Sequence, residues 1–360
     1  MTVSPRGRLI ARSRLLALAA ACAIAPTAAS AAEVSAPAWA LQRSLSALRD
    51  RAMWNEEAYV LSLLLTREVA AAFRAVGDEG WDDPRTRAAL LAYALSGGNR
   101  ALVRERLVRI GERLDPGVAE ATAAYLSRPD DAAAQLAEAV ALFPETVRPL
   151  VHLAIGALDP MADDAPMHLL RAELLAPGTL IEEAALRRRI ALPPHPGLDA
   201  GDWHHAALGY LRRFGGTRGG PATIRPIARG FAVHGAEFEP ADMRGVIDAA
   251  PTAMREALAL EIARECVLSG HAALARAALA DQRNAPRRRL YTAAAGPLDV
   301  PDVPALALPD PRDQSLLLAR QALGEAIRRA PEADAVGNGE VFSGVEDALR
   351  AARFAREGAE

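Results

Sequence analysis

Residues 83–127, DPRTRAALLAYALSGGNRALVRERLVRIGERLDPGVAEATAAYLS, decide the fold class. The Asp-Pro pairs at 83–84 and 115–116 predict helix starts, because aspartate caps the first free amides and proline at the first helical position loses no hydrogen bond. Gly97 and Gly98 predict a helix end, because glycine adopts the left-handed conformation at little cost. The stretch therefore predicts three short helices at 84–96, 99–110 and 116–127.

The same pattern of helix starts and ends continues on both sides. Alternate helix starts fall near 84, 116, 145 and 180, and a period of about 30 to 35 residues is typical of tetratricopeptide-like helix pairs stacked as a solenoid. The consensus residues of that repeat are not clearly present. We also expect helices at 38–52, 55–77, 130–143, 145–157, 163–175, 180–191, 200–214, 221–234, 240–250, 252–268 and 270–282.

Apolar residues recur at helical spacing within these segments. In the segment 55–77 most of them lie three or four residues from the next, which predicts an amphipathic helix with one buried face. The residues of this stripe are Leu61, Leu64, Leu65, Val69, Phe73 and Val76.

The composition agrees with an all-α protein. Aromatic residues make up 4% of the 360 residues, while 82 are alanine, the strongest helix former. All 42 basic residues are arginine, so lysine Schiff-base chemistry and a Walker-type phosphate loop are excluded. The fold class that we expect is all-α, a tetratricopeptide-like helix-pair solenoid.

The first 31 residues have the pattern of a secretory signal peptide. Four arginines precede an apolar run at 15–25, and Ala29, Ser30 and Ala31 form an Ala-x-Ala cleavage site. Cys22 lies in the apolar run, one position too far from a leucine for a lipoprotein signal. Cleavage after Ala31 leaves 38 arginines against 45 acidic residues, a net charge of −7. We expect a periplasmic protein that is not inserted in the membrane after cleavage.

The pattern predicts five parts of the chain. The signal peptide at 1–31 is followed by a helical-repeat domain at 32–214 and by further helices at 215–296 after a glycine-rich break. Five prolines within 297–311 predict a linker, because no helix tolerates that density. Residues 312–360 are expected to form C-terminal helices, near 312–330 and 343–356, and a tail.

One cluster of histidines and one of glycines suggest ligand sites, but each lacks the further residues that such a site requires. His195, His204 and His205 lie close in sequence, but adjacent histidines on a helix point about 100° apart and no further ligand pair is nearby, so we expect surface histidines and no metal. The glycines at 215–220 follow a helix and lack a lysine, which favours a flexible connector over a phosphate site. We expect no cofactor.

Other chemical functions also lack their signatures. The arginine clusters at 187–189, 212–213 and 287–289 occur in an acidic exported chain without stacking aromatics, which argues against nucleic-acid binding and favours solvated helix ends. No Glu-Ser dipeptide of the kind used by lytic transglycosylases and no Gly-x-Ser-x-Gly elbow occurs. Cys266, the one cysteine left after cleavage, is expected to be buried and inert.

Three segments resemble a known family. They are the segment 81–98, with Trp81, Asp83, Pro84, Gly97 and Gly98; the segment 174–188, LLAPGTLIEEAALRR; and Tyr210-Leu211-Arg212-Arg213-Phe214. Together with the export signal they resemble the MotC family of periplasmic motility proteins. In the second segment Pro177 and Gly178 stop a helix, and Thr179 with Glu182 predicts a capping box that starts the next one. We interpret these residues as structural, and partner-binding residues are not identifiable.

The resemblance implies a protein without enzymatic activity. It implies that the chain enables flagellar rotation by binding the periplasmic part of a MotB-type stator subunit. Two alternatives stay open: a periplasmic helical-repeat adaptor for envelope or cell-wall assembly, and a wall-modifying enzyme. The enzyme would require a buried, convergent pair of carboxylates in the structure.

Overall fold

The chain folds into α-helices throughout the part that the structure describes. The structure is a computed structural model that describes residues 36–127, 129–195, 197–280, 288–289, 291–292, 295 and 313–314. Every helix in these ranges belongs to the compact unit that begins at Pro37. Within them, the one β-type pairing is an isolated bridge between His195 and Leu198. The all-α class is therefore confirmed.

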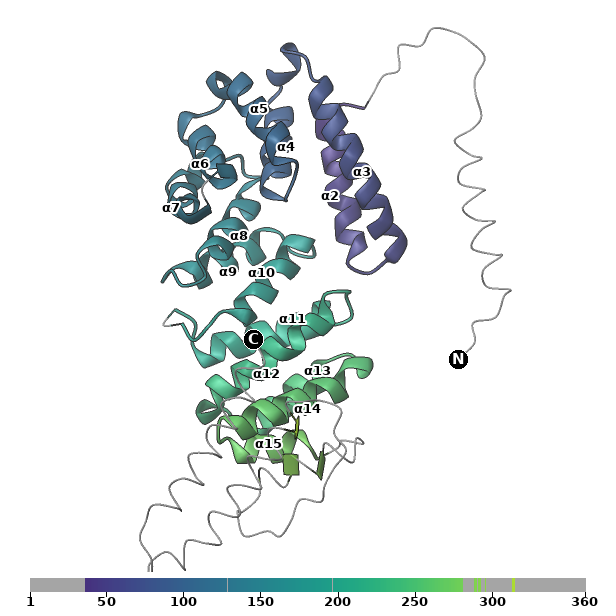
Figure 1. Cartoon of the computed structure of the whole chain (residues 1–360), viewed down its shortest axis with the longest axis vertical. Helices are drawn as coiled ribbons and strands as arrows, with labels where there is room; N and C mark the ends of the chain where they lie inside the picture. Colours follow the sequence, from purple (N-terminus) through teal and green to yellow (C-terminus); the bar gives the residue numbers. More distant parts are fainter. Residues whose placement is uncertain are drawn as a thin grey trace, which may run out of the picture. The chain divides into compact units, whose positions relative to one another are not determined.

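Fourteen α-helices follow one another in the described part of the chain (Figure 1). They are α2 (Ala38–Ala52), α3 (Glu56–Ala75), α4 (Pro84–Leu95), α5 (Arg100–Ile110), α6 (Pro116–Ser127), α7 (Pro129–Ala139), α8 (Arg148–Leu158), α9 (Ala165–Leu175), α10 (Leu180–Ala191), α11 (Ala200–Phe214), α12 (Ile224–Val233), α13 (Pro240–Ala249), α14 (Thr252–Leu268) and α15 (Ala272–Ala278).

The helices stack as a repeat. Helices α4, α6, α8 and α10 begin at residues 84, 116, 148 and 180, a constant spacing of 32 residues. Helix α4 packs on α6 and α8, α8 packs on α10, and α10 packs on α12, so alternate helices form a continuous row. Each helix expected between residues 38 and 280 is present, with shifts of a few residues at its ends. The helical-repeat, solenoid-like architecture is confirmed.

Local capping explains where these helices begin and end. The Asp83 carboxylate accepts a hydrogen bond of 2.9 Å from the amide of Arg85, and Pro84 is the first residue of α4. Gly97 and Gly178 have φ angles of 83° and 77°, which side chains rarely adopt. The sequence signals at these positions therefore act through the backbone, as expected.

Three apolar clusters hold the stack together. The first joins α2–α5 around Phe73, Trp81 and Tyr93, and the second joins α4 with α6–α8 around Leu136 and Phe143. The third extends from α10 to α15 and includes Trp203, Tyr210 and Phe231. Each helix pair is therefore stabilised by burial against its neighbours, as in other repeat architectures.

The apolar stripe expected on α3 is only half buried. Val69 and Phe73 are fully buried, but Leu61 and Leu64 are 46% and 54% exposed. The prediction of one continuous buried face was wrong for the first half of the helix. The reason is tertiary: α3 packs chiefly on α2, and in its first half the side that faces α2 carries Ala58 and Ser62 instead.

The glycine-rich run 215–220 is not the flexible connector that we expected. Gly215, Thr217 and Gly220 are buried, and the amide of Arg218 donates a hydrogen bond of 2.9 Å to the carbonyl of Met53. A β-carbon on Gly220 would lie 2.0 Å from the carbonyl oxygen of Gly215. The glycines therefore permit a close backbone approach in a packed turn, and the third apolar cluster includes residues from both sides of it.

Several predictions lie outside the described residues. They are the signal peptide at 1–31 with Cys22, the cluster 287–289 as a whole, the linker at 297–311, and the helices expected after residue 314. Among the helices that the structure describes, none is long and apolar enough to cross a membrane.

Candidate functional site: a buried polar network between α9, α10 and α11

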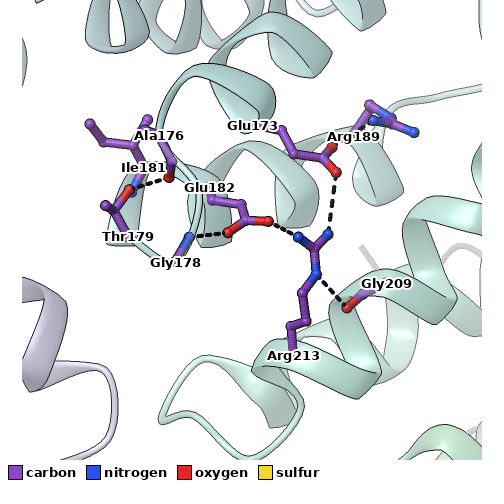
Figure 2. Close-up of polar contacts among 9 residues, drawn as sticks. All are labelled: Glu173, Ala176, Gly178, Thr179, Ile181, Glu182, Arg189, Gly209 and Arg213. Carbon is purple, nitrogen blue, oxygen red and sulfur yellow. Dashed lines mark hydrogen bonds and ion pairs between the residues drawn. The ribbon is translucent and has the colours of Figure 1, made fainter. Parts of the chain in front are cut away.

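The corner between α9 and α10 is held by side chains of the segment 174–188 (Figure 2). The Thr179 hydroxyl accepts a hydrogen bond of 3.2 Å from the amide of Ile181 and donates one of 2.7 Å to the carbonyl of Ala176. The Glu182 carboxylate accepts from the amide of Gly178. The expected capping box is therefore modified: Thr179 caps α10, but Glu182 binds the residue before the cap instead of the cap's own amide.

Glu182 connects this corner to α11. Its side chain is nearly fully buried, and its second carboxylate oxygen pairs with the Arg213 guanidinium, as Figure 2 shows. Arg213 also reaches Glu173 of α9 at 3.3 Å, and Glu173 pairs with Arg189 of α10 at 2.7 Å. Four alternating charges thus link three consecutive helices, which satisfies carboxylates whose burial would otherwise be costly.

The neighbouring Glu183 makes a second connection between α10 and α11. Its carboxylate accepts a hydrogen bond of 2.9 Å from the Tyr210 hydroxyl and lies 3.3 Å from the Arg187 guanidinium. Burial and the nearby Glu183 charge raise the pKa of Tyr210 well above its usual value, so the phenol stays protonated and donates. A β-carbon on Gly219 would approach the Glu183 carboxylate to 2.7 Å, so the turn after α11 closes over this pair.

This arrangement fixes the geometry of helices and does not present a free reactive group. Glu182 and Glu183 each contact an arginine and also accept a neutral donor. A general acid needs a carboxyl directed at a substrate, whereas both carboxylates here are directed at arginines of the protein itself. The network joins α9, α10 and α11 to one another, and fixing the register of packed elements is the best-attested use of buried ion pairs.

The residues predicted in the segment 81–98 lie in a different cluster. Trp81 is fully buried and stacks on Phe73, with ring centroids 6.3 Å apart and planes 10° from parallel. A β-carbon on Gly98 would lie 2.5 Å from Tyr93, so this glycine is needed where the chain turns between α4 and α5. The structure thus brings together two of the three segments that resemble the family, 174–188 and 210–214. The segment 81–98 instead contributes to the first apolar cluster.

The predicted histidines do not converge on a metal site. The ring of His195 is buried between the carbonyl of Ala162 at 2.9 Å and the amide of Gly197 at 3.0 Å, so it is not a surface histidine as we expected. His204 packs against Phe238, and its neighbour His205 is exposed. Among the described residues, no group of three or more His, Cys, Asp or Glu side chains could hold a metal ion.

A histidine pair that the sequence did not indicate lies between α8 and α9. The Nδ1 atoms of His152 and His168 are 2.9 Å apart, and both rings are buried. Burial, together with the charges of His168, Arg171 and Arg148, lowers the pKa of His152 to about 4. The pair therefore shares one proton between neutral rings at ordinary pH.

The arginine clusters are only partly solvated helix ends. Arg188 and Arg212 are exposed, but Arg189 is 7% exposed and belongs to the buried network. Cys266 is buried as expected, and burial raises the pKa of its thiol to about 12. A neutral buried thiol of this kind is a poor nucleophile.

Sequence reasoning missed most of the network. Glu173, Glu183, Arg189, Tyr210 and Arg213 were not singled out as a group, although 174–188 and 210–214 were recognised as distinctive. One signal was available: Glu182 and Glu183 directly precede the apolar residues Ala184, Ala185 and Leu186 of α10. Charges placed within such a stretch indicate buried partners.

The described residues thus form an all-α, helical-repeat protein whose most extensive polar network joins its own helices. The chain belongs to the family described as Chemotaxis protein MotC, which matches residues 4–357. The resemblance drawn from the three segments is thereby confirmed, and the match extends well past the glycine run. The chain is 28% identical over 320 residues to the chemotaxis protein MotC of Rhizobium meliloti (strain 1021), covering 80% of this chain and 72% of that relative. No solved structure matches the chain.

Proposed function

We propose that this protein is an exported, non-enzymatic motility protein that binds the periplasmic domain of a MotB-type stator subunit. Membership of a chemotaxis family supports a role in motility. Glu182 and Glu183 of the buried network each contact an arginine and a neutral donor of the protein itself. This supports binding over catalysis, because neither carboxylate is directed at a substrate. The pattern of the first 31 residues supports export.

An exposed apolar face on α9 carries this proposal. Leu174 and Leu175 are 67% and 53% exposed, and Met167 on the same face is 49% exposed. Large apolar side chains gathered on a surface mark interaction sites. Leu174 and Leu175 stand at the start of the segment 174–188, and the network around Glu182 joins the corner beside them to α11. A rigid apolar surface binds a partner with little cost in conformational entropy.

Binding of the two purified proteins tests the proposal. We expect the mature chain to bind the stator periplasmic domain at micromolar concentration in calorimetry, without metal or cofactor. Replacing both Leu174 and Leu175 with serine should weaken binding at least about tenfold, since central apolar anchors carry most of an interface's energy. Val108→Ser on α5 is the matched control, because Val108 is 89% exposed and distant in sequence.

The adaptor for envelope or cell-wall assembly is the second candidate. It shares the fold and the exposed face, so a deletion strain separates the two. Cells that keep their flagella but do not spread in soft agar support the motor role. Absence of binding by the folded protein, together with normal spreading, would favour the adaptor. Hydrolysis of purified peptidoglycan would instead favour the wall-modifying enzyme.

A further inference from the structure

The first half of α3 is apolar on almost every side. Ala58 and Ser62 face inward, yet the outward residues are apolar too, and no helix is packed on them in the described part of the chain. These outward residues are Tyr59, Val60, Leu61, Leu63 and Leu64, and they are 39% to 54% exposed. A helix that is apolar all round is normally buried on all sides, so this face is expected to have a partner.

The exposed face has the spacing of a helix-packing seam. Glu57, Val60, Leu64 and Arg67 follow one another at intervals of three, four and three residues, which places them on one stripe. The stripe has an acidic residue at one end, a basic residue at the other, and apolar residues between them. All four side chains belong to exposed residues.

This stripe is complementary to itself when reversed. An antiparallel helix related by a two-fold axis near residue 62 places Val60 of each copy opposite Leu64 of the other. The same axis places Glu57 opposite Arg67 of the second helix, twice by symmetry. A two-fold interface requires this reciprocity, in which residue i contacts j and j contacts i.

In the part of the chain that the structure describes, the surroundings of the stripe leave it accessible. Glu56, the other acidic residue at the start of α3, is paired with Arg218, whose guanidinium lies 4.1 Å from the Tyr59 ring centroid. This contact anchors the edge of α3 to the turn after α11. The second half of α3 turns Val69 and Phe73 into the core, so the apolar excess is confined to the self-complementary stretch.

We propose that a second copy of this chain packs antiparallel on α3 and forms a two-fold dimer. The occupant is a second copy because both the apolar and the charged positions match their own reversed order. This inference is independent of the stator partner, whose proposed surface is on α9.

Analytical ultracentrifugation of the mature chain at micromolar concentration and low salt tests the proposal. We expect twice the monomer mass for the unaltered protein and for Val108→Glu, and the monomer mass for Leu64→Glu. Circular dichroism should be the same for all three, since Leu64 and Val108 are both exposed.

Charge exchange gives the sharper test. Glu57→Arg and Arg67→Glu should each weaken the dimer about tenfold, because each replaces two attractive pairs with two repulsive ones. The double variant E57R/R67E should restore the original affinity. A monomeric unaltered protein, a dimer insensitive to Leu64→Glu, or a double variant no stronger than the single ones would overturn the proposal. If later residues of the same chain cover α3, the unaltered protein will be monomeric, which overturns the proposal.

Discussion

The hydroxyl of Tyr210 donates a 2.9 Å hydrogen bond to the carboxylate of Glu183, 27 residues earlier, and so joins the segments 174–188 and 210–214. Both segments carry the resemblance to the MotC family, and the Glu182–Arg213 ion pair joins them again beside this contact. Their shared position explains why those residue types occur there. They hold α10 and α11 in register, and the α9 surface proposed for the partner depends on that register.

Tyr210→Phe should lower the free energy of unfolding by about 2 kcal/mol. The substitution removes the donor and leaves a buried, charged acceptor with one partner fewer. Chemical denaturation measures the change. Tyr59→Phe is the matched control, because its ring is 39% exposed, and it should change stability by less than about 0.5 kcal/mol. Equal effects of the two substitutions would contradict the role assigned to Glu183.

Arg189→Met should cost about 2 to 3 kcal/mol, because it leaves the largely buried Glu173 carboxylate with Arg213 alone. Arg212→Met provides the comparison, since Arg212 is exposed and should tolerate the change within about 0.5 kcal/mol. Thermal unfolding of both variants gives the answer. A stable Arg189→Met protein would mean that the network contributes specificity without net stability.

Thr179→Ala should cost about 1 kcal/mol, because the amide of Ile181 loses its acceptor at the start of α10. Binding to the stator domain, measured on the folded variant, should not change. If binding is lost while thermal unfolding is unaltered, the threonine belongs to the contact surface and not to the cap.

Acid should destabilise the protein through His152. Its pKa is about 4 in the folded state and 6.5 as the ordinary value, so below pH 6.5 the unfolded chain takes up a proton that the folded chain does not. Stability therefore falls as the pH drops from about 6.5 to about 4. Burial also lowers the pKa of His168, but Asp164, which lies 3.4 Å from the His168 ring, opposes this by favouring the charged ring. Asp164 therefore reduces the loss of stability in acid.

Melting temperatures measured across this pH range test the assignment. His152→Gln keeps a polar side chain but removes the titration, and its melting temperature should depend less on pH between 4 and 6.5. His205→Gln on α11 is the control, because that ring is exposed. A profile for His152→Gln that parallels the unaltered protein would show that other groups cause the acid sensitivity.

We expect the protein to be exported and its mature form to begin at Ala32. The basic start, the apolar run at 15–25 and the Ala-x-Ala site at 29–31 together predict this cleavage. Mass spectrometry of the protein purified from the periplasmic fraction checks it. An intact residue 1 or a lipid on Cys22 would contradict the prediction.

Local signals made the helices predictable. Asp83 with Pro84 begins α4, Gly97 follows its end, and Thr179 begins α10, as the residues indicate. These features are encoded within a few residues, because caps and left-handed glycines act on the adjacent backbone. The glycine run at 215–220 was misinterpreted because the same glycines serve a flexible link and a tight backbone contact equally well.

The candidate site was recognised only as separate pieces. Thr179 and Glu182 were singled out for a capping role, but Glu182 also pairs with Arg213, 31 residues away. No spacing rule links the two, because their approach depends on how α10 and α11 pack. The same holds for the His152–His168 pair, which joins two helices.

The sequence by itself therefore determined the all-α class, the positions of the helices and membership of the MotC family, since these depend on local backbone preferences and residue identity. Only the tertiary structure decided which charges are buried and which apolar side chains are exposed. Arg189 and Leu64 show this in opposite directions: the arginine is enclosed beside Glu173, while the leucine faces outward on α3. The physical reason is that burial depends on the neighbours a helix acquires, and those neighbours come from distant parts of the chain.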